Sequence, residues 1–403
     1  MITKMKDKVY WVGAVDWESR HFHGHELSIH RGSTYNAYLI VDQKVALVDT
    51  VWTPFADQLM SNIREVVDPA KIDFVIANHS EMDHAGALPE VMRHAPNAEL
   101  IVSRKGAESI PGHFHEQWPT KPVKTGDKIG LGENELVFVE APMLHWPDSM
   151  FTYLTGKNIL MPNDAFGQHY ATAHRFNDEV DQSELFEECL KYYANILTPY
   201  SSLVTKKIEE VVGLNLPVDI IAPSHGVIWR KDPLQIVNKY AEWAKQIPQQ
   251  RAVVIYDTMW GGTRRMAEAI GEGLAEAGVD NKVYHAVTAD RNDTLMEVFK
   301  ARTVIVGSPT LNNGLLPTIW PILQDLKGLK FKNKIAGAFG TYGWSGEGVK
   351  VIEEHLRDCG FEVPVAGVKY KWQPTAEHIE GCRAFGREIG KATKNAEHGE
   401  HAE

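Results

Sequence analysis

The sequence contains few cysteines, and no two of them lie close together along the chain. Only Cys189, Cys359 and Cys382 occur in 403 residues, and there is no CxxC motif. This argues against a disulfide framework, a thiolate zinc knuckle and a rubredoxin-type iron site within the chain. Free thiols in such number are typical of a reducing compartment, so we expect a cytoplasmic protein.

Long apolar runs and an excess of basic residues are also missing. No apolar run approaches the roughly 20 residues of a membrane span, and Met1 to Val15 lacks the apolar segment of a signal peptide. Lysine and arginine total 42 against 53 aspartates and glutamates, for a formal net charge of −11. Nucleic-acid partners select basic surfaces, so we expect neither a membrane nor a nucleic acid as a partner.

The chain is too long for one ordinary hydrophobic core, and its patterns change near residue 250. Before that point, strand-like runs such as 37–41, 45–49 and 135–140 come in succession, with shorter helical patterns between them. This order predicts two packed sheets covered by helices, an αβ/βα sandwich, in a domain of residues 1–247. Residues 247–250 are interpreted as a polar connector.

The second part of the chain alternates strongly between strands and helices. This alternation predicts a doubly wound parallel sheet in a domain of residues 251–393, followed by a polar tail, 394–403. The expected strands are 252–256, 282–286, 303–307, 334–340 and 363–368, and the expected helices are 263–277, 293–299, 319–326, 346–359 and 376–391.

The densest group of potential metal ligands follows the apolar run 74–77. His79, Glu81, Asp83 and His84 stand within six residues there. Residues two apart project the same way in such a loop, so His79 and Glu81 can serve one ion while Asp83 and His84 point toward a second. The alternative is a polar loop whose carboxylates cap the next helix.

Three later residues favour the metal interpretation. His145, Asp164 and His225 each stand at the end of an apolar run, where loops gather into a site. A single histidine of this kind is usually structural. Three such residues in an order compatible with one site are less easily coincidental.

This order resembles that of the metallo-β-lactamase superfamily, whose loop reads HxHxDH and is followed by His, Asp and His ligands. The resemblance covers about residues 1–247, with one departure. Glu81 stands where the hydrolases carry their second histidine, and a carboxylate is a harder ligand that favours iron over zinc. The HxExDH form is the one that flavodiiron proteins carry.

The resemblance implies a ligand set and two further residues of the site. One iron takes His79, Glu81 and His145, the other takes Asp83, His84 and His225, and Asp164 bridges both, with an oxide or hydroxide beside it. In some members the histidine that matches His84 is turned away from the metal. His23 and Tyr193 match positions that line the substrate pocket and can hydrogen-bond a bound diatomic, although ordinary packing is the alternative for each.

A second constellation suits an anionic cofactor. The expected strand that ends at Asp257 is followed by Thr258, Met259, Trp260, Gly261, Gly262 and Thr263, where a helix begins. Such a turn surrounds an anion with backbone N–H groups. No Walker lysine is present, so a triphosphate fits poorly. The spacing resembles the flavodoxin TxTGxT phosphate loop, with Trp260 in place of the middle threonine.

Two further loops match the isoalloxazine loops of that family. They are Ser308, Pro309, Thr310, Asn312, Asn313 and Gly314 in the first, and Thr341, Tyr342, Gly343, Trp344, Ser345 and Gly346 in the second. Both follow expected strands at the edge where doubly wound sheets bind ligands. Trp344 is a candidate to stack on the flavin ring, and a loop for a terminal monophosphate favours FMN over FAD.

The two resemblances together imply a terminal reductase. Electrons from an external donor pass through FMN to the irons, which reduce dioxygen to water, nitric oxide to nitrous oxide, or both. Rubredoxin is the first choice of donor, with a reduced deazaflavin as an alternative. Family members place one subunit's FMN near the partner's irons, so we expect a head-to-tail homodimer or a dimer of dimers.

Two other functions compete with this one. The first is a zinc hydrolase, which Glu81 and the flavin domain disfavour. The second is an electron-transfer flavoprotein with a vestigial first half, which the complete ligand set disfavours. The sequence does not choose between the two gases.

Overall fold

The computed structural model describes residues 2–396, which form two compact units. The first unit contains the chain up to Tyr192 together with Ser202–Ala241, and the second contains Tyr193–Ser201 and the chain from Glu242 on. We expected the division at 247–251. The contacts instead divide the chain after Ala241 and assign a short segment after Tyr192 to the second unit.

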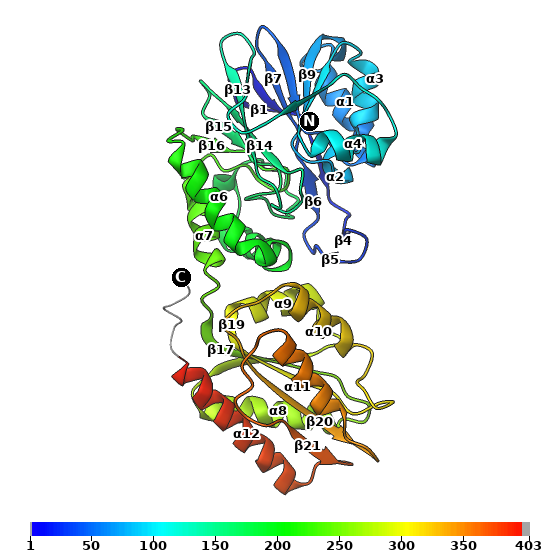
Figure 1. Ribbon diagram of the computed structural model, residues 1–403, viewed down its shortest axis with the longest axis vertical. Coiled ribbons are helices and arrows are strands. Elements are labelled where there is room, and N and C mark those ends of the chain that lie inside the picture. The colour runs from blue at the N-terminus through cyan, green and yellow to red at the C-terminus, as the bar shows by residue number, and fades with distance from the viewer. Residues whose placement is uncertain (1, 397–403) are drawn as a thin grey trace. The chain divides into compact units, whose positions relative to one another are not determined.

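Two β-sheets form the framework of the first unit (Figure 1). The seven-stranded sheet has the order β1-β2-β7-β8-β9-β10-β11, and it is antiparallel up to β8 and parallel from there on. Its strands are β1 (Thr3–Lys6), β2 (Val9–Trp11), β7 (Tyr38–Val41), β8 (Val45–Val48), β9 (Ile72–Ala77), β10 (Glu99–Ser103) and β11 (Thr120–Val123).

The second sheet of this unit has five strands in sequence order. Its members are β12 (Lys128–Gly130), β13 (Glu135–Glu140), β14 (Met150–Leu154), β15 (Ile159–Met161) and β16 (Ile220–Ile221). One hydrophobic cluster joins the two sheets, since it contains Ile76 and Ile101 of the first together with Phe138 and Met150 of the second. Burial of each such side chain stabilises the fold by roughly 1.5–3 kcal/mol. The predicted sandwich is confirmed.

Short helices and two small two-stranded sheets complete the first unit. The hairpin of β4 (His21–Phe22) and β5 (Leu27–Ser28) carries His23 at its turn, and β3 (Ala14–Asp16) pairs with β6 (Ser33–Tyr35). The helices are α1 (Ala56–Arg64), α2 (Met82–Ala85), α3 (Leu88–His94), α4 (Gly106–Phe114), α5 (Gln182–Tyr192), α6 (Ser201–Gly213) and α7 (Leu234–Ala244).

The second unit is built on one parallel sheet of order β18-β17-β19-β20-β21. This 2-1-3-4-5 order is that of the flavodoxin-like doubly wound fold, so the predicted class is confirmed. The strands are β17 (Gln249–Tyr256), β18 (Asp280–His285), β19 (Ala301–Gly307), β20 (Ile335–Tyr342) and β21 (Val368–Lys371).

Helices cover both faces of this sheet (Figure 1). Successive residues of β17 point to opposite faces, so Val254 joins one hydrophobic cluster and Val253 the other. The Val254 face packs against α8 (Gly262–Glu276) and α12 (Ala376–Asn395). The Val253 face packs against α9 (Arg291–Lys300), α10 (Ile319–Gly328) and α11 (Gly348–Asp358).

Three predicted elements in this half differ from the structure by three residues or more at one end. The last strand is 368–371 rather than 363–368, because β21 is an edge strand whose residues alternate between half-buried and exposed and so form no apolar run. The polar residues Gln249 and Gln250 belong to β17 and not to a connector. Helix α12 extends to Asn395, and the rest of the expected tail, from residue 397, lies outside the described residues.

None of the helices between residues 2 and 396 is long and apolar enough to span a membrane.

Candidate metal centre and cofactor cleft

The seven predicted metal ligands converge at one edge of the sandwich, because the segments that carry them all leave strands there. His79 and Glu81 follow β9, and Asp83 and His84 lie in α2. The other three follow β13, β15 and β16, and are His145, Asp164 and His225. Both hydroxyl and backbone N–H of Thr50 donate to the carbonyl of His84, at 2.6 and 2.8 Å, which ties α2 to the end of β8.

One group of three side chains faces one oxygen of Asp164. Glu81 Oε2 lies 3.2 Å from His79 Nε2 and 3.7 Å from His145 Nε2. The same two nitrogens lie 4.0 and 3.6 Å from Asp164 Oδ2. We call the group of His79, Glu81 and His145 the His79 position.

A second group of three faces the other oxygen of Asp164. Asp83 Oδ2 lies 3.1 Å from His84 Nε2 and 3.0 Å from His225 Nε2. These nitrogens lie 3.0 and 3.6 Å from Asp164 Oδ1. We call the group of Asp83, His84 and His225 the His225 position. His84 therefore points inward, toward both aspartates.

Asp164 thus stands between two matched sets of donors. Each position offers two imidazoles and one carboxylate, and Asp164 presents a different oxygen to each. The ligand atoms of His79, His145 and Asp164 lie close enough together to hold one ion, and those of Asp83, His84 and His225 lie close enough to hold another. The predicted bridging place of Asp164 agrees with this geometry.

Several polar atoms of the site are buried without a hydrogen bond, which fits a missing positive group. Among the described residues these atoms include Asp83 Oδ1 and Asp164 Oδ2. Leaving such groups unpaired is costly unless something else satisfies them. Nitrogen and carboxylate oxygen donors in this number suit iron.

The charges of the site lead to the same conclusion. Burial opposes the charged form of Asp164, yet the histidines around it, His84 first, hold its pKa well below the usual value. Burial likewise opposes the charged form of His84, but Asp164 and Asp83 raise its pKa to about 9. The buried carboxylates therefore require positive charge at the centre of the site, which two metal ions would supply.

The loop that carries His225 depends on a glycine. Gly226 has a φ of +74°, and a Cβ there would lie 1.5 Å from Gln168 Oε1, an atom that accepts the backbone N–H of Val227. A side chain at this position would push the turn away from the site. The turn also places His225 Nδ1 2.6 Å from the carbonyl of Thr34.

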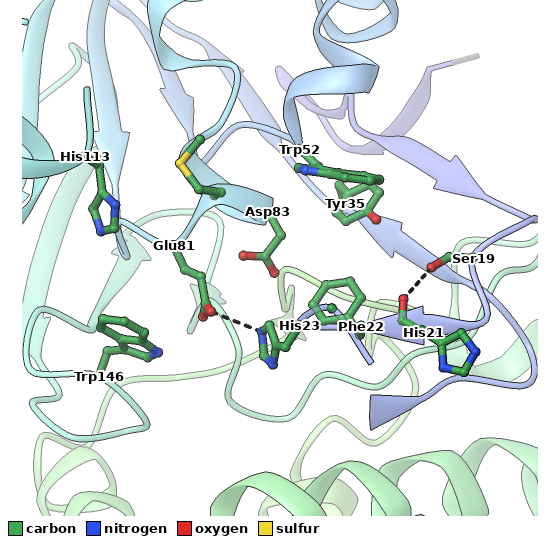
Figure 2. Close-up of a pocket in the computed structure, with 12 residues that line it drawn as sticks. Ser19, His21, Phe22, His23, Tyr35, Trp52, Glu81, Asp83, His113 and Trp146 are labelled. Atoms are coloured by element: carbon green, nitrogen blue, oxygen red, sulfur yellow. Dashed lines mark hydrogen bonds and ion pairs between the residues drawn. The ribbon is translucent and has the colours of Figure 1, made fainter. Parts of the chain in front are cut away.

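His23 lies beside the predicted ligand Glu81. Its Nε2 is 3.1 Å from Glu81 Oε1, and it lines a cavity of about 440 Å³ in front of Glu81 and Asp83 (Figure 2). The apolar wall includes Phe22 and Tyr35. The full lining is Ser19, His21, Phe22, His23, Gly24, Tyr35, Trp52, Glu81, Met82, Asp83, His113 and Trp146.

The placing of Tyr193 at this site is wrong. Tyr193 belongs to the second unit, where its hydroxyl lies 3.1 Å from Ser201 Oγ and its ring packs against Trp243 and Phe299. Its neighbour Tyr192 lies beside the site instead, with its ring 5.3 Å from that of His169, and burial and the nearby Asp164 raise its pKa well above the usual value. The helix changes to a π-helical turn at Tyr193–Leu197, and this extra width alters which residue faces which side.

Sequence reasoning also missed Asp148 and His169. Asp148 Oδ1 lies 3.1 Å from His79 Nδ1, and the ring of His169 lies 5.0 Å from that of His225. The one available signal for Asp148 was its place three residues after His145. Nothing in the sequence pairs it with a histidine 69 positions earlier.

The predicted flavin loops line a cleft of about 270 Å³ in the second unit. The turn before α8 is shaped by Gly261, with a φ of +81°, and by Thr258 Oγ1, which accepts the N–H of Gly261 at 3.0 Å. Helix α8 then points its N-terminus at the cleft, as phosphate sites require. The lining is Thr258, Met259, Trp260, Gly262, Pro309, Thr310, Thr341, Tyr342, Gly343, Trp372 and Gln373.

Other residues of these loops support the cleft from behind. Thr263 Oγ1 lies 3.0 Å from Thr341 Oγ1, and the buried Ser308 accepts the N–H of Leu316. Asn312 and Asn313 both have positive φ and form a tight turn closed by Leu311 and Gly314. Trp344, Ser345 and Gly346 lie outside the lining, so their contact with a flavin stays a prediction.

Trp372 and Gln373 are lining residues that the sequence analysis missed. Trp372 has a φ of +65°, and its ring lies 3.4 Å from where a Cβ on Gly343 would stand. Gln373 donates to the carbonyl of Trp260. Both follow the edge strand β21, whose bounds were also predicted wrongly.

A paired-metal site in a β-sandwich and an anion-binding cleft in a flavodoxin-like sheet define a two-domain metalloflavoprotein. Residues 34–226 match the model of the ODP family of β-lactamases, and residues 254–386 match that of flavodoxins. The chain is 49% identical to the nitric oxide reductase of Moorella thermoacetica over 385 residues, which covers 95% of this chain and 96% of that protein. It is also 49% identical to an anaerobic nitric oxide reductase flavorubredoxin of Escherichia coli O1:K1, over 96% of this chain and 81% of that protein.

Solved structures agree with these relatives. Rubredoxin oxygen:oxidoreductase from Desulfovibrio gigas has a TM-score of 0.96 at 40% identity and covers 98% of this chain and 99% of its own. The flavodiiron protein from Giardia intestinalis has a TM-score of 0.93 at 35% identity, with coverages of 98% and 97%. The chain belongs to the flavodiiron protein family. It is an oxidoreductase whose flavodoxin domain binds FMN, and its homologues carry a diiron centre.

Proposed function

We propose that this protein is a terminal reductase in which electrons from an external donor enter FMN and reach a diiron centre in the first domain. There they reduce dioxygen to water or nitric oxide to nitrous oxide. The observation that carries the proposal is the placing of Asp164, whose two oxygens face two matched sets of imidazole and carboxylate donors. A pair of irons, when bound, stores two electrons and offers open positions to a small gas.

Residues around the ligands orient one of them and shield the cavity from water. His23 lies next to Glu81 Oε1 and leaves Oε2 directed at His79 and His145, so it fixes the orientation of the carboxylate. Phe22 and Tyr35 present apolar surface to the cavity and limit the water that competes with a gas.

Glu81 distinguishes this proposal from a zinc hydrolase. Together with Asp83 and Asp164 it supplies three negative charges to the two ions. This charge suits a site that holds ferric iron better than a site in which zinc activates water. Metal analysis of the purified protein tests this point. Zinc together with ester or lactam hydrolysis would contradict the proposal.

The names of the relatives divide between the two gases. Those at 49% identity are called nitric oxide reductases, and the structure at 40% identity is called an oxygen oxidoreductase. The proposal therefore covers both gases. Anaerobic assays with a chemically reduced donor, offered each gas in turn, determine the ratio of the two activities.

We propose rubredoxin as the donor. Support comes from the names of the Desulfovibrio gigas and Escherichia coli relatives, both of which refer to rubredoxin. This chain has three cysteines and no CxxC motif, so residues 1–403 supply no rubredoxin-type iron site of their own. The three free thiols also support a cytoplasmic location.

We further propose that the working form is a head-to-tail homodimer. Exposed apolar side chains surround the metal cavity in one unit, where Trp52, Met82 and Trp146 are 38–41% exposed. Others surround the flavin cleft, where Trp260 is 86% and Trp372 66% exposed. Exposed apolar rims of this kind mark interaction surfaces. A cavity of about 440 Å³ also exceeds the needs of a diatomic gas.

Substitution of Asp164 tests the central claim. Asp164→Ala should abolish both iron retention and gas reduction, because each position loses its shared carboxylate. Reduction of FMN by the donor should persist, since the flavin cleft lies in the other unit. Gas reduction at the native rate by the variant would show that the reaction occurs elsewhere.

A further inference from the structure

His79 is held from behind by a carboxylate. Its Nε2 faces Glu81 and Asp164, while its Nδ1 lies 3.1 Å from Asp148 Oδ1. The side chains of His79 and Asp148 are 0% and 3% exposed. A metal-binding Nε2 must carry a lone pair, so the ring proton is on Nδ1 and is donated to Asp148.

Asp148 is itself fixed by its surroundings. Its Oδ2 accepts the backbone N–H of Ser80 at 2.8 Å and lies 3.4 Å from Ser109 Oγ, and its carbonyl accepts from Ser103 Oγ at 2.7 Å. These bonds connect the residue to α4 and to the end of β10. Because these bonds fix the carboxylate, the carboxylate determines the orientation of the His79 ring.

The corresponding histidine of the other position has a different partner. His225 Nδ1 lies 2.6 Å from the carbonyl of Thr34, which is a neutral acceptor. The groups that face the two ions are the same in kind, two imidazoles and one carboxylate each with Asp164 shared. His79 and His225 thus differ in the charge of the group bonded to Nδ1, while the buried carboxylate of Asp49 acts on His84 through space, without a hydrogen bond that would orient its ring.

A carboxylate behind a ligating imidazole raises its basicity and fixes its orientation. We propose that Asp148 is a positioning residue that makes the His79 position the more readily oxidised of the two. Asp148 strengthens electron donation from His79, which stabilises the ferric state there and lowers the reduction potential. This inference rests on the proposed diiron function. It adds that the two irons differ in reduction potential, with the lower potential at the His79 position.

The test compares the iron-loaded full-length protein with its Asp148→Asn variant. The amide keeps the shape of the side chain and its oxygen can still accept from His79, but it lacks the charge and its NH2 group cannot accept the N–H of Ser80. We expect iron retention against a chelator to fall on the order of 10- to 100-fold. We also expect the reduction potential of the diiron centre to rise and the two Mössbauer signals to become more alike.

Ser109→Ala is the matched control, because it removes the distant contact to Asp148 Oδ2 and two contacts within α4, to the carbonyls of Lys105 and Gly106, and leaves the charge of Asp148 in place. It should leave iron retention and potential near those of the unmodified protein. A folded, fully iron-loaded Asp148→Asn protein with unchanged potential and unchanged Mössbauer signals would overturn the inference, even if its melting temperature fell.

A second variant covers the case in which Asp148→Asn does not fold. Asp148→Glu keeps the charge but moves it by one methylene, so weaker iron retention at native stability supports the inference and unchanged retention overturns it. If the proposed diiron function itself is wrong, the unmodified protein would bind no iron. That result is distinct from the results that would overturn the role of Asp148.

Discussion

Asp49 binds Asn78 with both of its carboxylate oxygens. Oδ1 accepts the backbone N–H of Asn78 at 2.8 Å, and Oδ2 accepts its side-chain amide at 3.0 Å. Oδ2 also accepts from Asn163 at 3.2 Å. Asn78 precedes His79, and Asn163 precedes Asp164. One buried aspartate thus connects two of the segments that carry metal ligands.

Asp49→Ala should destabilise the first unit by about 3 kcal/mol, because it leaves buried donors of both asparagines without an acceptor. Iron retention should fall as well, since the His79 and Asp164 segments lose their common anchor. Calorimetry of the apoprotein and iron analysis check the two effects. Asp57→Asn on the exposed surface of α1 is the control and should change stability by less than about 0.5 kcal/mol.

Gly261→Ala should weaken FMN binding. A Cβ at this position meets no atom within 4 Å, so its cost comes from the φ of +81° in the turn before α8. The expected strain is about 1 kcal/mol, or roughly a fivefold loss of affinity if the turn relaxes in the free protein. Quenching of flavin fluorescence measures this affinity.

Gly328→Ala at the end of α10 provides the comparison, since that glycine also has open space but has no positive φ. Equal FMN affinities in the two variants would show that the turn does not need its left-handed residue.

Lys334→Met should destabilise the second unit. The buried ammonium of Lys334 donates to the carbonyls of Val298, Phe299 and Ala301, at 2.7, 2.9 and 2.5 Å, at the end of α9. Methionine fills a similar volume but donates nothing, so we expect a loss of about 3 kcal/mol. Denaturant unfolding followed by flavin release measures the change.

Lys332→Met is the control for this substitution because that lysine is exposed. A loss of stability as large in the control would show that the three carbonyl contacts are not its cause.

The three thiols should resist alkylation in the native protein. Burial raises the pKa of Cys359 to about 11 and that of Cys382 to about 12, and it raises the pKa of Cys189 well above the usual value. The reactive species is the thiolate, and a thiol of pKa about 11 is ionised to only about 0.1% at pH 8. Reactivity should therefore rise with pH, with the half-buried Cys359 first.

Mass spectrometry after iodoacetamide treatment at pH 8 and pH 9.5 checks this order, with urea-unfolded protein as the fully reactive control. Labelling of Cys189 in the native protein as fast as that of Cys359 would contradict it.

The sequence predicts the ligand loops well because each of them follows an apolar strand. His79, His145 and Asp164 are recognisable because several such positions occur in an order compatible with one site, and strands that run in the same direction bring these ends to one edge. The supporting groups are different in kind. Asp49 and Asp148 act through partners 29 and 69 residues away, and no local pattern encodes such pairs.

The errors at Tyr193 and at β21 have different causes. Tyr193 was expected at the site from the family resemblance, whereas its contacts assign it to the second unit, where a π-helical turn begins. Strand β21 is a half-exposed edge strand, so it carries the alternating residues Lys369, Tyr370 and Lys371 rather than an apolar run. Trp372 and Gln373, which follow it, were missed for the same reason.

The shared carboxylate of Asp164 has a consequence for how the protein matures. An ion bound at one position orients the side chain of Asp164 and neutralises part of the negative charge around it. The orientation favours binding of a second ion at the other position, whereas the loss of negative charge disfavours it. If the geometric effect prevails, a cell short of iron would contain fully loaded and empty molecules with few half-loaded ones. Native mass spectra at substoichiometric iron would then lack a prominent single-ion species, and scarcity would reduce the number of working enzymes without producing defective ones.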